Sequence, residues 1–358
     1  MPISAVDTIT LAFQHAKRQL IQPFRFGQWT RLAIVGLLAG EMGSGGSFNF
    51  PSSFNPRHQS PSHHLLGQAF PKIDPALLGA LIAVLMVTGL VFTIVMLYVS
   101  SVMRFILFDS VLAKDCHIRA GWSRRQAPGW NYFLWQLGFM VVTLVAAVLL
   151  FGVPAAFAWT LGWFSHPGEH LVALIVGGIL MFFVAAAFFI AVAVVHVFTK
   201  DFVVPQMALE GIGPIEAWRR LWPMIQADNR GYAGYVGMKI VLAIGAGIVF
   251  GIVTLILALM LAIPAVAVAI AAVLTGKSAG LTWNVFTITA AVIAACILFV
   301  VFMYLIALIS VPVIVFFPAY AIYFFAARYR ALSLVLYPPP PAAPPQEPPP
   351  FPVAPAPA

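Results

Sequence analysis

The sequence predicts an all-α, polytopic membrane protein: a bundle of six transmembrane helices arranged as three hairpins, with interfacial helices on the cytoplasmic face. Of the 358 residues, 62% are hydrophobic and only 8% are charged, whereas soluble domains carry about 25% charged residues. Apolar runs long enough to cross a bilayer recur along the chain, and basic residues gather between them. A chain with so little charge must turn most of its surface to lipid.

The N-terminal segment, residues 1–27, is predicted to form an amphipathic helix. Val6, Ile9, Phe13 and Leu20 recur at spacings of three, four and seven, which places them on one helical face. Because an apolar face opposite a charged one is typical of helices that lie in the membrane interface, we expect this helix to lie there.

Residues 28–330 are predicted to form the six-span membrane domain. The first span, at about 28–42, is short and could be tilted or incomplete, and an irregular loop rich in Ser, Gly, Pro and His follows it. The other spans are expected at about 76–111, 131–153, 171–199, 234–263 and 284–310, followed by an interfacial or extended helix at 311–330.

Prolines mark the expected ends of several helices, because proline removes a backbone donor and clashes with the preceding turn. We expect a break in the third span near Pro154, a kink or end at Pro264 in the fifth, and a kink or end at Pro223 in the segment before it. The tail, residues 338–358, is proline-rich and is predicted to be disordered.

The distribution of Lys and Arg predicts the orientation. Of 19 such residues, all but Arg57, Lys72 and Lys277 fall on one side of the six-span layout. By the positive-inside rule, that side and both termini are cytoplasmic, in the inner membrane of a bacterium. The net charge of +8 lies between apolar runs, which favours anionic lipid headgroups over nucleic acid as its partner.

Three segments, starting at Ala16, Ala120 and Ala217, share one order of features. Each has paired basic residues, then a proline, an aromatic residue and an apolar run. This order favours three repeated helical hairpins. The alternative is that every segment entering a membrane needs basic and aromatic residues.

The stretch "ALEGIGPIEAWRRLW", residues 208–222, predicts a turn between the fourth and fifth spans. Glycines allow unusual backbone angles, and a proline suits the first turn of a helix. The stretch could be a structural helix–turn–helix at the membrane surface, or a shaped loop that binds a headgroup or a partner. The turn residues are Pro205, Glu210, Gly211, Gly213 and Pro214.

Basic and aromatic residues near the spans are candidates for binding lipid phosphates or a partner protein. The alternative is that they only anchor the topology. These candidates are Arg104, Trp122, Arg124, Arg125, Trp218, Arg219, Arg220 and Trp222.

The segment "KDFVVPQMALEGIGPIEAWRRLWPMIQADNRGYAGYVGMKIVLA", residues 200–243, carries the clearest pattern: a helix end, a proline, an acidic-glycine turn, a basic-aromatic helix and another span. It resembles the membrane domain attached to some glycerophosphodiester phosphodiesterases and related stand-alone six-helix proteins of uncharacterised function. The resemblance implies a fold and a membrane role. It does not imply the hydrolase, because a proline-rich tail follows the last span here.

Three further patterns in the sequence concern helix packing, metal binding and disulfide formation. Small residues at i, i+4 and i+8 predict close helix contact within the chain or with a partner: Ala243, Gly247 and Gly251. Histidines of two outer loops are candidate zinc or copper ligands, although we expect no metal and no cofactor: His63, His64, His166 and His170. The two cysteines are expected at different membrane levels, which disfavours a disulfide: Cys116 and Cys296.

The sequence therefore predicts a non-enzymatic membrane protein, because no catalytic constellation is recognisable. We expect a structural or accessory component that contacts lipids and either a larger membrane complex or further copies of itself. The alternative is a carrier or scramblase for lipids or small solutes. Ion-coupled transport would need acidic groups within the spans, and only Glu41 and His196 come near.

Overall fold

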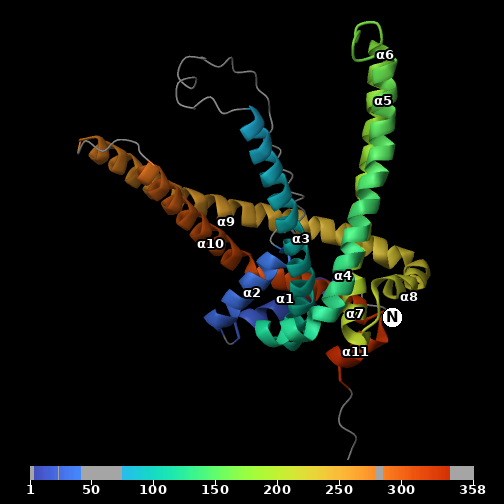
Figure 1. Ribbon diagram of the computed structural model, residues 1–358. Helices are drawn as coiled ribbons and strands as arrows, with labels where there is room; N and C mark the ends of the chain where they lie inside the picture. Colours follow the sequence, from blue (N-terminus) through green and yellow to red (C-terminus); the bar gives the residue numbers. More distant parts are fainter. Residues whose placement is uncertain (1–3, 23, 42–74, 279–284, 339–358) are drawn as a thin grey trace, which may run out of the picture.

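The computed structural model describes residues 4–22, 24–41, 75–278 and 285–338, and its elements are helices (Figure 1). This confirms the all-α class. The predictions for His63, His64 and the proline-rich tail beyond residue 338 lie outside the described residues.

The elements follow one another in the order that Figure 1 labels. They are α1 (Asp7–Leu20), α2 (Phe26–Leu38), α3 (Pro75–Ala113), α4 (Ile118–Ala147), the π-helical turn η2 (Val148–Gly152), α5 (Val153–Thr160), α6 (Leu171–Phe198), the π-helical turn η3 (Thr199–Val203), α7 (Val204–Glu210), α8 (Pro214–Ala227), α9 (Asn229–Ser278), α10 (Val285–Ala326) and α11 (Arg330–Leu336).

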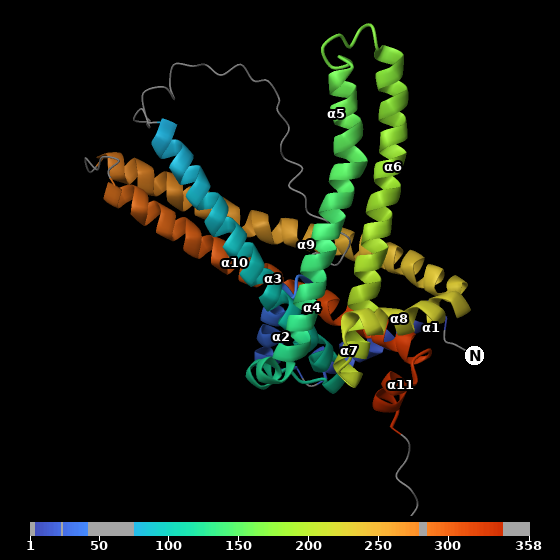
Figure 2. The ribbon, with the colours of Figure 1, turned by 45° about the vertical axis from the view of Figure 1, so that its right-hand side comes forward.

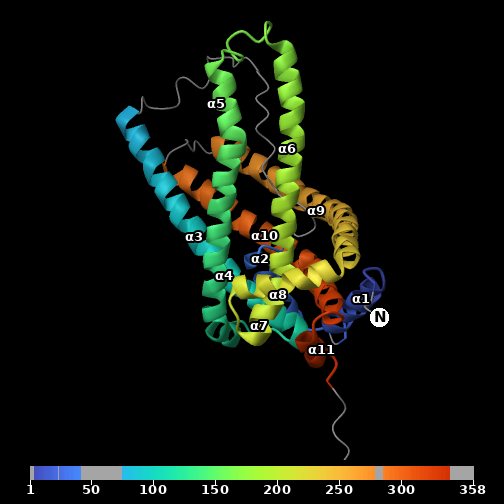
Figure 3. The same ribbon diagram turned by 90° about the vertical axis from the view of Figure 1, so that its right-hand side faces the viewer.

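The helices meet at one end of the molecule, which we call the base. It consists of α1, α2, η3, α7, α8 and α11 with the adjoining ends of α3, α4, α9 and α10. From it α3, the α4–α6 pair and the α9–α10 pair project in different directions (Figures 1 and 2). The N-terminus and α11 both lie at the base (Figure 3).

The core of the protein lies in the base. Helix α10 packs there against α1, α2, α3, η3, α9 and α11. Phe202 of η3 stands at its centre, with ring centroids of Tyr235 and Phe325 at 5.0 and 5.2 Å. Such aromatic contacts add to the stabilisation that burial provides. The base is therefore a packed unit, and the projecting helices are extensions of it.

The six-span prediction is not confirmed. Five helices in the described ranges are long and apolar enough to cross a membrane: Gly79–Ala113, Ile118–Thr160, Leu171–Glu210, Asn229–Gly276 and Phe286–Ala326. Helix α2 has 13 residues, so it is only about 20 Å long, against about 30 Å of hydrocarbon. The chain leaves this helix at Gly40, whose φ of 75° ends regular helix.

The predicted break at Pro154 and the predicted helix ends at Pro223 and Pro264 are wrong, whereas the alternative of a kink at Pro223 and Pro264 stays a prediction. Pro223 lies inside α8 and Pro264 inside α9. Pro154 follows η2, whose wider turn joins α4 to α5 without a break. Each proline costs one backbone hydrogen bond. Breaking an apolar helix would leave many more groups unpaired, so the helix continues. The spans are accordingly longer than predicted.

The three-hairpin arrangement is likewise not confirmed. Helix α9 packs along part of α10. The α4–α5 segment meets α6 through Phe151 of η2, whose ring centroid lies 5.7 Å from that of Phe188. Helix α2 packs against both α3 and α10, so its contacts are not confined to one neighbour in sequence. Its approach to α10 is close, because a Cβ at Gly36 would lie 2.5 Å from Ile314.

Helix α1 docks by a face that includes only part of its apolar stripe, since Leu20 is buried and Ile9 is partly buried. Val6 and Phe13 remain exposed, whereas Ala12, His15 and Gln19 are buried. Gln19 Nε2 donates to the Ser110 carbonyl at 2.9 Å. His15 Nε2 donates to the Val111 carbonyl at 2.9 Å, and its Nδ1 lies 3.1 Å from the Tyr323 hydroxyl. The carbonyls belong to the last turn of α3, which has no intrahelical partners for them. Helix α1 therefore caps α3 and leaves Val6 and Phe13 of its apolar stripe exposed.

This docking predicts a pH dependence. Burial lowers the pKa of His15 below its ordinary 6.5. The unfolded chain therefore binds this proton at higher pH than the folded chain does. Stability should be complete above about pH 6.5 and fall below it, by no more than about 1.4 kcal/mol per pH unit until the folded-state pKa is reached.

The measurement compares unfolding midpoints of the native chain and His15→Gln between pH 7.5 and 5. Glutamine can donate to the Val111 carbonyl but does not titrate in this range. Other titrating groups are common to both chains, so the difference between the two pH profiles isolates His15. Parallel profiles would contradict the prediction.

Candidate functional site

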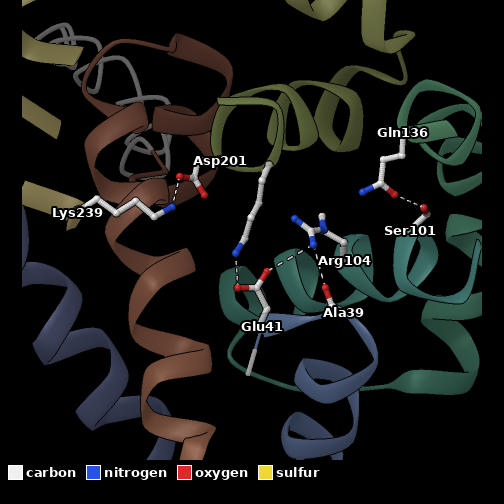
Figure 4. A network of polar contacts seen from close by, with 8 residues as sticks. Ala39, Glu41, Ser101, Arg104, Gln136, Asp201 and Lys239 are labelled. Carbon is white, nitrogen blue, oxygen red and sulfur yellow. Dashed lines mark hydrogen bonds and ion pairs between the residues drawn. The ribbon is translucent and has the colours of Figure 1, made fainter. Parts of the chain in front are cut away.

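Charged side chains from four segments converge in the base, between the projecting helices (Figure 4). Glu41 follows α2, Arg104 belongs to α3, Lys200 and Asp201 to η3, and Lys239 to α9. All except Glu41 lie in helices that are apolar enough to cross a membrane. Ionisable groups at such positions are costly and commonly serve a function. We call these five residues the ionic cluster.

Glu41 is shared between two cations. The Lys200 ammonium donates to Glu41 Oε2, and Arg104 Nη2 lies 3.9 Å from Glu41 Oε1. Arg104 Nη2 also donates to the Ala39 carbonyl at 2.9 Å, as Figure 4 shows. This carbonyl lies at the C-terminal end of α2, where a cation is favourable. Arg104 therefore fixes the end of α2 and places Glu41 within reach of Lys200.

Asp201 forms the second half of the ionic cluster. It accepts a hydrogen bond from the Lys239 ammonium and another from the Tyr235 hydroxyl at 2.8 Å. The π-helical turn η3 carries Lys200 and Asp201 in succession, so that Lys200 turns toward Glu41 and Asp201 toward α9. Wide turns of this kind often occur at functional sites.

Four of the five members of the ionic cluster are buried, and Lys200 is partly buried. The relative exposure of Glu41 is 1%, of Asp201 5%, of Arg104 7% and of Lys239 8%. Burial alone would raise the pKa of Glu41, but the charges of Lys200 and Arg104 lower it to about 2. Glu41 is therefore ionised at neutral pH. With three cations and two carboxylates, the ionic cluster has one positive charge in excess.

A second polar contact ties α4 to α3 and α7. Arg125 holds Asp109 with two hydrogen bonds of 2.7 Å, from Nε and Nη2. Its Nη1 donates to the Ala208 carbonyl at 2.8 Å. These contacts use three of the five guanidinium N–H groups in a paired geometry. The structure thus places Arg125 among contacts within the chain.

Hydrogen bonds within the chain also fix the turn between α7 and α8. Gly211 has φ 68° and ends α7, and Gly213 and Pro214 begin α8. Glu210 accepts hydrogen bonds from the Arg220 guanidinium and the Tyr329 hydroxyl, which ties the turn to the end of α10. The helix–turn–helix that the sequence favoured is present, with Pro205 buried at its start.

The remaining lipid or partner candidates lie around the base and are not brought together in one site. Trp222 and Arg124 are exposed. The Trp218 indole donates to the Thr199 hydroxyl at 3.2 Å, and Trp122 stacks edge-on to Tyr98. Arg219 pairs with Glu216 on the surface of α8. Whether the exposed members bind lipid stays a prediction.

The structure also places the residues predicted for helix packing and for metal binding. Ala243 is buried, whereas Gly247 and Gly251 are exposed on α9. The outer-loop histidines His166 and His170 lie between α5 and α6. No group of three or more His, Cys, Asp or Glu side chains suited to a metal is found among the residues that the structure describes. The cysteines are free thiols, Cys116 buried and Cys296 exposed.

Sequence reasoning missed the ionic cluster as a unit. In the structure Arg104 contacts Glu41, and Asp201 contacts Lys239. A signal for Lys239 was present, because this lysine falls inside the predicted fifth span, where charges are rare. The sequence contains no comparable signal for its partner, since Asp201 is 38 residues away.

A comparison with protein-family models gives one match, to the "Family of unknown function (DUF7544)", over residues 3–335. The chain belongs to this family. The DUF7544 match runs from α1 to α11, so the base, the ionic cluster and the projecting helices are all part of one family unit. This match agrees with the expected uncharacterised family and shows no link to glycerophosphodiester phosphodiesterases. No curated protein and no solved structure matches the chain.

Proposed function

We propose that this DUF7544-family chain is a non-enzymatic, multi-pass membrane protein that acts as a structural or accessory component. Its base supplies a rigid platform, and its projecting helices contact lipids, helices of a partner complex, or further copies of the chain. A location in a bacterial inner membrane belongs to the same proposal.

One observation carries this proposal. In the five long helices, the most apolar stretches of 18 residues are between 0 and 6% buried. Apolar surface of this extent is unfavourable in water and has to be covered by lipid or protein. Because the helices diverge from the base, they offer separate apolar faces to such neighbours (Figure 2).

The proposed orientation places the base on the cytoplasmic side. Its surface carries exposed basic residues, as expected for the side that faces anionic headgroups. The chain enters and leaves the described region at the base. These basic residues are Lys17, Arg18, Arg25, Arg31, Lys114, Arg119 and Arg124.

A carrier or scramblase is the second candidate. The observation in its favour is the polar ionic cluster in helices that are otherwise apolar. A carrier would need a polar path between packed spans. The separate outer portions of the helices favour the accessory role instead.

The test places a photoreactive amino acid at exposed positions of two projecting helices, Val176 in α6 and Leu255 in α9, each 60% exposed. In native membranes we expect adducts with lipid or with a discrete protein. The control position is Asp115, an exposed acidic residue between α3 and α4, which should give few adducts. Predominant cross-links between α6 and α9 of one chain would contradict the proposal, because they would mean that the spans close into a bundle.

The carrier alternative has its own measurement. The purified chain is placed in vesicles that contain headgroup-labelled phospholipid, and the transfer of label between leaflets is followed. The accessory role predicts the rate of protein-free vesicles. Transfer that rises with the amount of protein would establish the alternative.

A further inference from the structure

The base contains one buried cation that is not fully neutralised. Lys239 is paired with Asp201, and Lys200 is paired with Glu41. Arg104 has only a 3.9 Å approach to Glu41, which Lys200 already engages. A buried charge without close compensation is strongly unfavourable. The ionic cluster therefore favours the arrival of one further negative charge.

Not all hydrogen-bond donors of Arg104 are used within the described residues. Its side chain is 8% exposed, and Nη2 is used by the Ala39 carbonyl. The Nε and Nη1 groups are buried and have no acceptor among the described residues. Tyr132 of α4 is a neighbour of this guanidinium: its ring centroid lies 5.9 Å from the guanidinium carbon, and its hydroxyl is buried. Buried donors without acceptors are rare in folded proteins, because they lose the hydrogen bonds that water would give.

A cavity lies beside Arg104. Its volume is about 30 Å³, and its polar lining consists of Glu41, Arg104, Lys200 and Asp201. A cavity needs roughly 10–15 Å³ to hold one water molecule, so this one admits a small group. The rest of its wall is mostly apolar and comes from α3, α7 and α10: Leu107, Phe108, Val204, Pro205, Pro318, Ala321 and Ile322.

We propose that this cavity binds one phosphate-type oxyanion, with Arg104 as its main donor and Lys200 as the neighbouring cation. The planar guanidinium matches phosphate oxygens, and an ammonium acts beside it as a point charge. A phospholipid headgroup and free inorganic phosphate share this chemistry. The inference goes beyond the accessory role and does not depend on it.

The first experiment uses the purified full-length chain in an uncharged detergent. Inorganic phosphate is titrated against chloride at equal ionic strength, and the unfolding midpoint is followed. Phosphate should raise the midpoint of the native chain, because a ligand of the folded state stabilises it. Arg104→Gln should weaken the apparent Kd at least about tenfold. Arg230→Gln removes an exposed charge at the start of α9 and should leave the Kd unchanged.

A second variant should change the affinity for phosphate in the opposite direction. Glu41→Gln removes a carboxylate that competes for Arg104 and Lys200, so phosphate should bind more tightly than to the native chain. A purely structural ionic cluster predicts no such gain. If Arg104→Gln does not fold, Glu41→Gln still tests the proposal. Arg104→Lys serves beside it, because lysine keeps the charge but cannot form the two parallel hydrogen bonds of a guanidinium.

A parallel titration with dihexanoyl phosphatidic acid separates the two sources. A shift with inorganic phosphate that depends on Arg104 supports a site for free phosphate. A shift that depends on Arg104 and occurs only with the short-chain lipid supports a headgroup site. Equal shifts in the native chain and Arg104→Gln with both probes would overturn the proposal, as would weaker binding to Glu41→Gln.

Discussion

Replacing Asp201 with leucine is expected to lower the free energy of unfolding by about 3–5 kcal/mol, because it leaves a buried ammonium without its carboxylate. Lys239 is 8% exposed and pairs with Asp201 in the described structure. The Tyr235 hydroxyl would lose its acceptor in the same step. The measurement is unfolding in mixed micelles of mild and denaturing detergent.

The double variant Asp201→Leu with Lys239→Met tests the cause. It removes both charges, so most of the lost stability should return, whereas two independent effects would add. The exposed pair Glu216 and Arg219 provides the control, and Glu216→Gln should change stability by less than about 1 kcal/mol. A single Asp201→Leu effect below that limit would show that the ionic cluster does not hold η3 against α9.

The helices themselves could be predicted from the sequence because their signal is local. Composition and apolar run length identify α3, α4, α6, α9 and α10, and periodicity identifies α1. The ends of the helices could not be placed. Proline ends helices in water because the backbone groups that it frees can bond to water instead. In an apolar environment no water is available to replace those hydrogen bonds. Pro264 therefore lies within α9.

The face by which α1 docks shows a second limit. Its apolar stripe is plain in the sequence, but the buried face carries His15 and Gln19. Their partners are carbonyls of Ser110 and Val111 at the end of α3. Every residue has a backbone carbonyl, so the residue types in a sequence do not indicate which carbonyls need a hydrogen-bond donor.

The ionic cluster shows a third limit. Each member is visible as a charge near an apolar run, and Lys239 lies inside one. The choice of partner depends on how η3, α2 and α9 meet in the base. Glu41 and Lys200 are 159 residues apart, and the end of α2 at Gly40 decides where Glu41 lies. Such contacts follow from tertiary packing, which a pattern along the chain does not contain.

Replacing Gly129 with leucine is expected to destabilise the base by about 1–3 kcal/mol or more, because α3 and α4 cross there at close range. A Cβ at Gly129 would lie 2.7 Å from Val102 Cγ2 and 3.2 Å from Val102 Cα. The backbone atom cannot turn aside as a flexible side chain would, so α4 has to move. The measurement is again unfolding in mixed micelles.

The control lies on the same helix. A Cβ at Gly138 would meet nothing within 4 Å, so Gly138→Leu should be neutral or gain the better helix propensity of leucine, up to about 0.8 kcal/mol. The crossing at Gly129 lies between Arg125, which holds Asp109, and Tyr132, which stands beside Arg104. Moving α4 should therefore disturb both contacts at once. A Gly129→Leu chain as stable as Gly138→Leu would show that α4 is free to shift, and that the ionic cluster does not depend on this crossing.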